Sequence, residues 1–97
     1  MAARFLEGKG WKIAGRNVRY GARLELDIVG VAEGTVVFVE VKTRANERFG
    51  RPFSAVDSGK RRRIVRAASR FLREGGWRLG EKVRFDVVEV EIGRAHV

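Results

Sequence analysis

Residues 24–31 (LELDIVGV) and 35–42 (TVVFVEVK) decide the fold, because each segment alternates as a half-buried strand requires. Glu33 and Gly34 lie between the two segments, and a loop of two or four residues centred on this pair closes a β-hairpin. A slip of one residue in the register would send every side chain to the opposite face. The loop length therefore determines which charged groups meet.

This register predicts a concentration of charge on one face of the hairpin. Asp27 lies opposite Glu40, and Glu25 lies opposite Lys42. Opposed side chains of an antiparallel pair have Cβ atoms about 4.5–5.5 Å apart, and like charges at that distance are destabilising. A divalent cation would offset the repulsion, since Mg²⁺ is commonly held by one or two carboxylates with water and phosphate oxygens. Asp27, Glu40 and Lys42 are therefore the candidate site.

The alternative is that these charged residues form an ordinary solvated face with mundane salt bridges. Val29 and Phe38 share that face in the predicted register, so apolar side chains cover part of it. Carboxylates beside buried apolar groups are poor candidates for mere solubility, and we favour the site.

The composition predicts a single domain, residues 1–97, because the 97-residue chain has no Pro- or Ser-rich break. It has no apolar run of about 18 residues and no N-terminal pattern of a secretory signal, so we expect a cytoplasmic protein without a membrane span. The absence of cysteine excludes disulfides, thiolate metal sites and cysteine nucleophiles. The one histidine, His96, makes histidine-based catalysis an unfavoured option.

The formal net charge of +9 indicates a polyanionic partner, with nucleic acid as the leading candidate. The basic residues gather in residues 60–74 (KRRRIVRAASRFLRE), which follow the helical period. Asp57 or Ser58 is a candidate cap at its start, and Gly75 with Gly76 ends it. One face is apolar and the other is cationic. The candidate phosphate contacts on this helix are Lys60, Arg62, Arg66, Arg70 and Arg73; the alternative is a surface helix that arginine merely makes soluble.

The remaining segments complete a short list of elements. Residues 2–8 are expected to be a short helix and residues 11–18 an opening strand. Residues 43–59 hold the only proline and are expected to be a loop that turns helical near residues 53–56. Residues 82–92 are a strong strand, in which Asp86 is expected to pair with an arginine such as Arg84 or Arg63. A frayed tail, residues 93–97, follows.

Over nearly its whole length the chain resembles the YraN-type family of small bacterial proteins. That family is similar to the restriction-endonuclease-like, or PD-(D/E)xK, superfamily and to the archaeal Holliday-junction resolvases within it. The motifs that carry the resemblance are LELDIV (residues 24–29), VFVEVKTR (37–44), FGRP (49–52), AVD (55–57), KRR (60–62) and RFDVV (84–88).

The resemblance implies an α/β fold with a central mixed β-sheet of four to five strands flanked by helices. It places an acid followed by Glu-x-Lys on Asp27, Glu40 and Lys42, with Mg²⁺ or Mn²⁺ held by Asp27, Glu40 and the backbone carbonyl of Val41. YraN-like chains usually carry a glutamate in a longer first helix, upstream of the position of Glu7, and this sequence begins after that point.

Two functions of different class follow. The first is a Mg²⁺- or Mn²⁺-dependent nuclease that hydrolyses phosphodiester bonds in DNA, with branched DNA as a candidate substrate. The second is a non-catalytic nucleic-acid-binding module on the same fold. A weaker third option is a protein-interaction or ribosome-associated adaptor, since small basic domains also bind RNA. A homodimer is a further hypothesis, because Phe53, Trp77 and Leu79 have no obvious place in a core.

Overall fold

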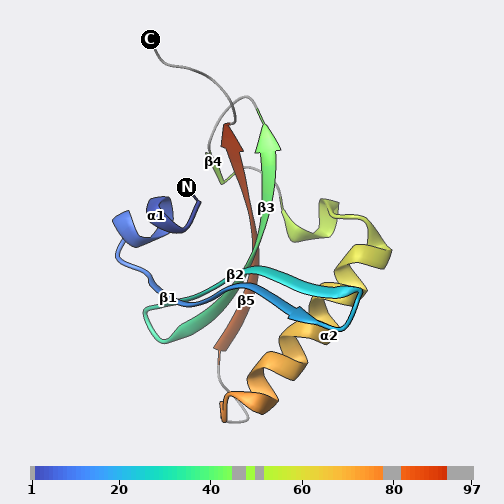
Figure 1. Cartoon of the computed structure of the whole chain (residues 1–97). Coiled ribbons are helices and arrows are strands. Elements are labelled where there is room, and N and C mark those ends of the chain that lie inside the picture. Colours follow the sequence, from blue (N-terminus) through green and yellow to red (C-terminus); the bar gives the residue numbers. More distant parts are fainter. Residues whose placement is uncertain (1, 45–47, 50–51, 78–81, 92–97) are drawn as a thin grey trace.

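The computed structural model describes residues 2–44, 48–49, 52–77 and 82–91, which form a mixed β-sheet with helices on both faces (Figure 1). The strands lie in the order β1-β2-β3-β5-β4. They are β1 (Lys12–Tyr20), β2 (Leu24–Ala32), β3 (Thr35–Arg44), β4 (Arg48–Phe49) and β5 (Lys82–Glu91). The helices are α1 (Ala2–Gly8), the 3₁₀ turn η1 (Phe53–Ala55) and α2 (Ser58–Glu74). The predicted class, α/β with a mixed sheet, is confirmed.

The central hairpin has the predicted loop. Glu33 and Gly34 alone connect β2 to β3, and both have positive φ angles, 51° and 78°, as a two-residue hairpin turn with the favoured twist requires. The ladder runs from this turn as far as the pair Ile28 and Val39. The predicted register is therefore confirmed over the inner half of the hairpin.

The chain then crosses over the sheet. From β3 it passes through β4, η1 and α2 before it returns as β5, which pairs with β3 in parallel along ten residue pairs from Thr35 and Lys82 to Arg44 and Glu91. The short strand β4 adds to the far edge of β5 in antiparallel register. Strand β4 falls within residues 43–59, which were predicted to be a loop, and two residues are too few for a periodic pattern to reveal.

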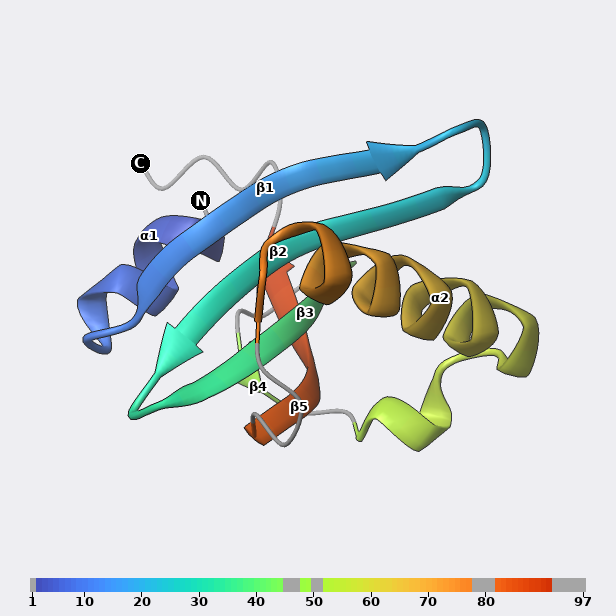
Figure 2. The same cartoon turned by 90° about the horizontal axis from the view of Figure 1, so that it is seen from below.

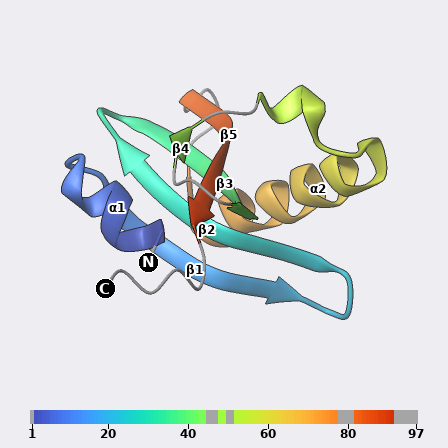
Figure 3. The same cartoon turned by 90° about the horizontal axis from the view of Figure 1, so that it is seen from above.

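Two separate cores cover the two faces of the sheet. Seen from below and from above, α1 and α2 lie on opposite sides of the strands (Figures 2 and 3). The core under α1 is aliphatic and contains Ala3, Leu6, Ile28, Val37, Val39 and Val88. The core under α2 has Phe38 at its centre and contains Leu26, Val29, Val36, Ile64, Ala67 and Ala68.

Two aromatic residues lie where the sequence did not place them. Phe53 and Trp77 are half-buried and pack against the α2 core, and the Phe53 ring stacks on Phe85 at 4.8 Å between centroids. We predicted a homodimer because Phe53 and Trp77 had no obvious core position. That premise is wrong for both residues. Leu79, the third residue of that argument, lies outside the described residues.

Helix α2 begins two residues before the predicted start. Asp57 caps it, because the side-chain Oδ2 accepts a hydrogen bond from the Lys60 N–H at 3.2 Å. Gly75 follows the last turn, as predicted. Strand β1 is shifted by one to two residues from residues 11–18, and β5 ends at Glu91. Within the described residues no helix is long and apolar enough to cross a membrane.

Candidate metal and nucleic-acid site

The hairpin opens beyond the pair Ile28 and Val39, and this opening creates the candidate site. Strand β3 keeps its partner β5 as far as Arg44, whereas β2 stays with β1, so β2 and β3 separate (Figure 1). The Val41 N–H, freed from the ladder, donates to Asp27 Oδ2 at 2.9 Å. Asp27 and Glu40 were predicted to lie directly opposite each other in the β2–β3 ladder, but the ladder ends before them. The Asp27 side chain instead reaches across from β2 to the backbone of β3, next to Glu40.

Glu40 is a buried carboxylate with an incomplete set of partners. Its side chain is 5% exposed, and the ammonium group of Lys60, from the first turn of α2, lies against Oε2. Lys60 is the cation that contacts this oxygen among the described residues. Each carboxylate oxygen has two acceptor sites, so Glu40 retains capacity for a further cation or donor.

Asp27 lies next to Glu40, and the pKa of its carboxyl group is shifted. Burial raises the pKa of Asp27 above its usual range, and the neighbouring Glu40 carboxylate raises it further. The hydrogen bond from the Val41 N–H and the ammonium of Lys60 act in the opposite direction without cancelling the rise. Contact with Glu40 is also the main reason that the pKa of Lys60 is raised. Two carboxylates thus share one cation.

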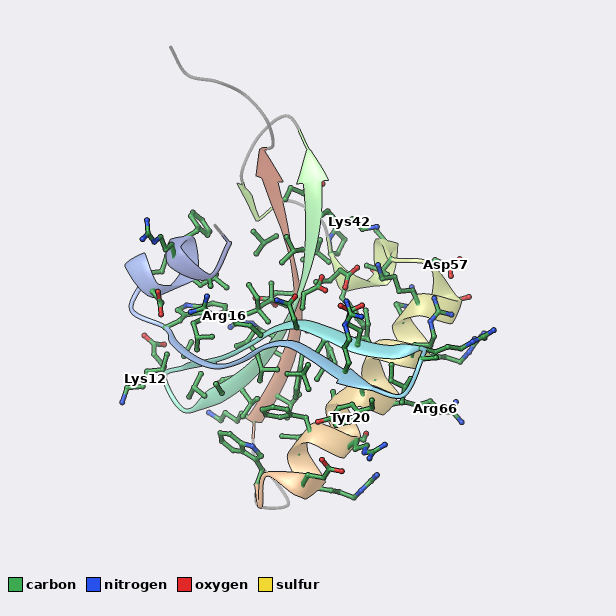
Figure 4. The ribbon with its side chains drawn as sticks, viewed as in Figure 1. Lys12, Arg16, Tyr20, Lys42, Asp57 and Arg66 are labelled. Atoms are coloured by element: carbon green, nitrogen blue, oxygen red, sulfur yellow. The ribbon has the colours of Figure 1, made fainter. Side chains whose placement is uncertain are left out.

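Lys42 comes from the same strand as Glu40 but makes a different contribution. It is half-buried, has no ion-pair partner in the described parts of the chain, and projects from β3 toward the side where Asp57 begins α2 (Figure 4). Its neighbour in the parallel register is Glu89, which is buried. The predicted partner of Lys42, Glu25, instead pairs with Arg19 across β1 and β2 at 3.5 Å. That prediction is wrong because β3 has left β2 at this point.

The cationic face of α2 divides into engaged and available residues. Arg70 donates to Glu74 at 2.8 Å and lies over the ring of Tyr20, 4.6 Å from its centroid. Lys60 is committed to Glu40. By contrast Arg62, Arg66 and Arg73 are exposed and have no ion-pair partner within the described ranges. Arg66 points away from the sheet in Figure 4.

Sequence reasoning missed two members of this region. Lys60 was assigned to phosphates, although its position one turn after the Asp57 cap also allows it to reach the sheet. Glu89 was not singled out, but it shares the alternation of Phe85 and Val87, which face the α2 core or are buried. Asp86 behaves as predicted and pairs with Arg84 at 3.0 Å. No group of three metal-ligating side chains (His, Cys, Asp or Glu) forms among residues that the structure describes.

The geometry defines a small α/β domain in which a half-buried and a buried carboxylate, Asp27 and Glu40, lie together beside an arginine-rich helix. The sequence matches the family described as "Uncharacterised protein family UPF0102" over residues 1–90. The chain belongs to this family, in agreement with the YraN-type resemblance of its motifs.

Proteins named only as UPF0102 members are similar to it over most of its length. One from Symbiobacterium thermophilum is 47% identical over 95 residues, which are 95% of this chain and 76% of that protein. One from Myxococcus xanthus is 43% identical and covers 96% of this chain and 71% of its own. One from Alkaliphilus oremlandii is 41% identical, with 95% and 79% covered.

Proposed function

We propose that the protein is a Mg²⁺- or Mn²⁺-dependent nuclease that hydrolyses phosphodiester bonds in DNA, on a restriction-endonuclease-like fold. The observation that carries the proposal is the opening of the β2–β3 hairpin. It leaves the half-buried Asp27 beside the buried Glu40, where their like charges are destabilising unless a cation is close. The resemblance to PD-(D/E)xK nucleases supports it, since their acidic and Glu-x-Lys positions coincide with Asp27, Glu40 and Lys42.

The donor set fits a hard divalent cation. Both carboxylates offer oxygen atoms, and one or two carboxylates are what Mg²⁺ usually takes from a protein. The backbone carbonyl of Val41 is the third proposed ligand. A bound Mg²⁺ or Mn²⁺ would polarise the scissile phosphate and stabilise the negative charge that develops on it.

The chain's own residues would supply the remaining chemistry. Lys42, on β3, is half-buried and has no ion-pair partner among the described residues. It is therefore available to orient the attacking water or to stabilise charge on the phosphate. Arg62 and Arg66 would hold backbone phosphates, which positions a strand without reading its sequence. Lys60 would leave Glu40 or share it when a metal binds.

Cleavage of fluorescent linear and four-way-junction DNA tests the proposal. With Mg²⁺ or Mn²⁺ we expect the wild type to cut and Glu40→Gln to fall to background. Glu25→Gln is the matched control, because it makes the same change on β2 at a residue that pairs with Arg19 outside the site. Equal cleavage by wild type and Glu40→Gln, or no cleavage by the wild type with either metal, would contradict the nuclease.

One observation favours a second function, a non-catalytic nucleic-acid-binding module. Lys60 already supplies a positive charge to Glu40, so the acid pair has a structural partner without any metal. In that case the ion pair would fix the start of α2 against the sheet and hold its arginines in place for binding. DNA affinity that falls with Glu40→Gln and does not depend on Mg²⁺ or Mn²⁺, in a protein that does not cleave, would select this module.

A further inference from the structure

The outer side of α2 carries a hollow that neither Asp27 nor Glu40 lines. It has a volume of about 630 Å³ and lies between η1 and the first turns of the helix. Phe53 and Val65 provide its apolar floor, and Arg61, Arg62 and Arg66 surround them. Val65 is 43% exposed, so an aliphatic side chain stands among arginines with nothing described covering it.

Fixed contacts give this hollow its shape. The guanidinium group of Arg61 donates to the backbone carbonyl of Ser54, which ties η1 to the helix. Phe53 is held from behind by Phe85, whose ring is stacked on it with an angle of 20° between planes. The aromatic floor is therefore held in place by the protein's own packing before any ligand arrives.

A second hollow of about 430 Å³ shares two arginines with the first and is lined by four arginines together with Leu24 and Gly59. Arg23, from the turn between β1 and β2, faces Arg62, Arg63 and Arg66 of α2 across it. Arg62 and Arg66 line both hollows. None of these four arginines has an ion-pair partner in the described part of the chain, so their mutual repulsion is not relieved within it.

We infer that the two hollows together bind an unpaired nucleotide of a nucleic-acid strand, with the base over Phe53 and Val65 and the phosphate among Arg23, Arg62, Arg63 and Arg66. In a nucleotide one sugar joins the flat base to the anionic phosphate. The first hollow offers an apolar surface for the base, and the second, which shares Arg62 and Arg66 with it, offers arginines for the phosphate. The inference deepens the proposed function, because it rests on nucleic acid as the ligand and selects strands with unpaired bases.

A paired duplex does not use the apolar hollow. Its bases are stacked on one another and present only their edges in the grooves, so a duplex would offer α2 phosphates alone. Proteins that bind single strands combine a positive groove with stacking surfaces for bases. Arginine also contributes by packing its planar guanidinium group against a base. The unpaired bases at a branch point or a strand end fit this combination.

Fluorescence anisotropy with three probes of equal length tests the inference: a single strand, the same strand with abasic sites, and the matching duplex. The variant is Val65→Glu, and the matched control is Ser69→Glu, an exposed position one turn further along α2 that lies outside both hollows. Both substitutions add one negative charge to the same helix. Thermal melting by circular dichroism checks that each remains folded.

We expect Val65→Glu to weaken single-strand binding at least about five-fold more than Ser69→Glu, in line with the loss of one stacked base. The two variants should weaken duplex binding equally, and the wild type should bind the abasic strand less tightly than the normal strand. Equal losses on the single strand, or equal affinity for the abasic strand, would overturn the base site.

These outcomes separate the inference from the nuclease proposal. A protein that prefers the single strand but does not cleave loses only the nuclease. Cleavage of DNA with no difference between Val65→Glu and Ser69→Glu removes only the base site. Failure to bind any of the three probes removes both.

Discussion

The two faces of the sheet are made by the same strands but carry different chemistry. Under α1 the fully buried residues are all aliphatic, and the strand residues Val37 and Val39 share this core with Leu6 of the helix. Under α2 the alternate residues of β3 are Val36 and Phe38, followed by Glu40. Strand β3 therefore contributes only apolar side chains to the core under α1, but a buried carboxylate, Glu40, to the side covered by α2.

The two faces differ in what they bury. The α1 face needs only apolar burial, and a short helix is sufficient to cover it. The α2 face buries charge, and it does so where β2 and β3 separate and where the covering helix is rich in arginine.

Truncation in the α1 core should cost stability and nothing else. Leu6 is fully buried, so Leu6→Ala should lower the free energy of unfolding by about 2–5 kcal/mol, as measured by urea denaturation. The folded fraction should bind DNA with unchanged affinity, because the site lies on the other face. A parallel loss of DNA affinity in fully folded protein would show that the two faces are coupled.

Removal of the ammonium from the α2 face should be the next largest effect. Lys60→Met leaves Glu40 buried without its cation, which for fully buried pairs costs about 3–5 kcal/mol. Because the Lys60 side chain is 43% exposed, we expect a loss below that range. The double variant with Glu40→Gln should recover part of it in a double-mutant cycle. Additive losses would mean that the two groups do not interact.

The first and second halves of α2 should differ in their dependence on salt. Arg66 is exposed and without an ion pair in the described residues, whereas Arg70 is held by Glu74 and Tyr20. Arg66→Ala should therefore reduce the log–log salt slope of duplex DNA binding by about 0.9, the value for one phosphate contact. Arg70→Ala should leave the slope nearly unchanged. Equal slopes for the two variants would contradict this division of the helix.

The smallest effect concerns the charge on Asp27. Its raised pKa means that the folded state disfavours the carboxylate, so the cost is present above the folded-state pKa and disappears below the ordinary pKa of aspartate. Asp27→Asn keeps an oxygen acceptor for Val41 and should stabilise the metal-free protein near pH 7 by a few tenths to about 1 kcal/mol. The gain should vanish near about pH 3. Destabilisation at both pH values would show that the charge is favourable.

The hairpin could be predicted from the sequence because its determinants are local. Alternation and the Glu33-Gly34 loop fix which residues oppose each other near the turn, and the structure keeps that register to Ile28 and Val39. The separation beyond this point could not be predicted in the same way. It arises because β3 continues with β5, a strand some forty residues later in the sequence, while β2 continues with β1.

The residues of the candidate site likewise divide into those set by local sequence and those set by long-range packing. Asp27 and Glu40 were found because their strand positions nearly coincide in the hairpin register. The contact of Lys60 with Glu40 depends on how α2 docks on the sheet, and helical periodicity alone places Lys60 near the arginines. Whether Lys42 acts on a substrate stays a prediction.

Isothermal titration calorimetry with Mn²⁺ tests whether Asp27 and Glu40 together hold a divalent cation. We predict saturable binding to the wild type, loss of binding in Glu40→Gln, and unchanged binding in the control Glu25→Gln. Lys60→Met should bind Mn²⁺ more tightly than the wild type, because an ammonium no longer competes for Glu40. Equal Mn²⁺ affinity in the wild type and Glu40→Gln would contradict the claim.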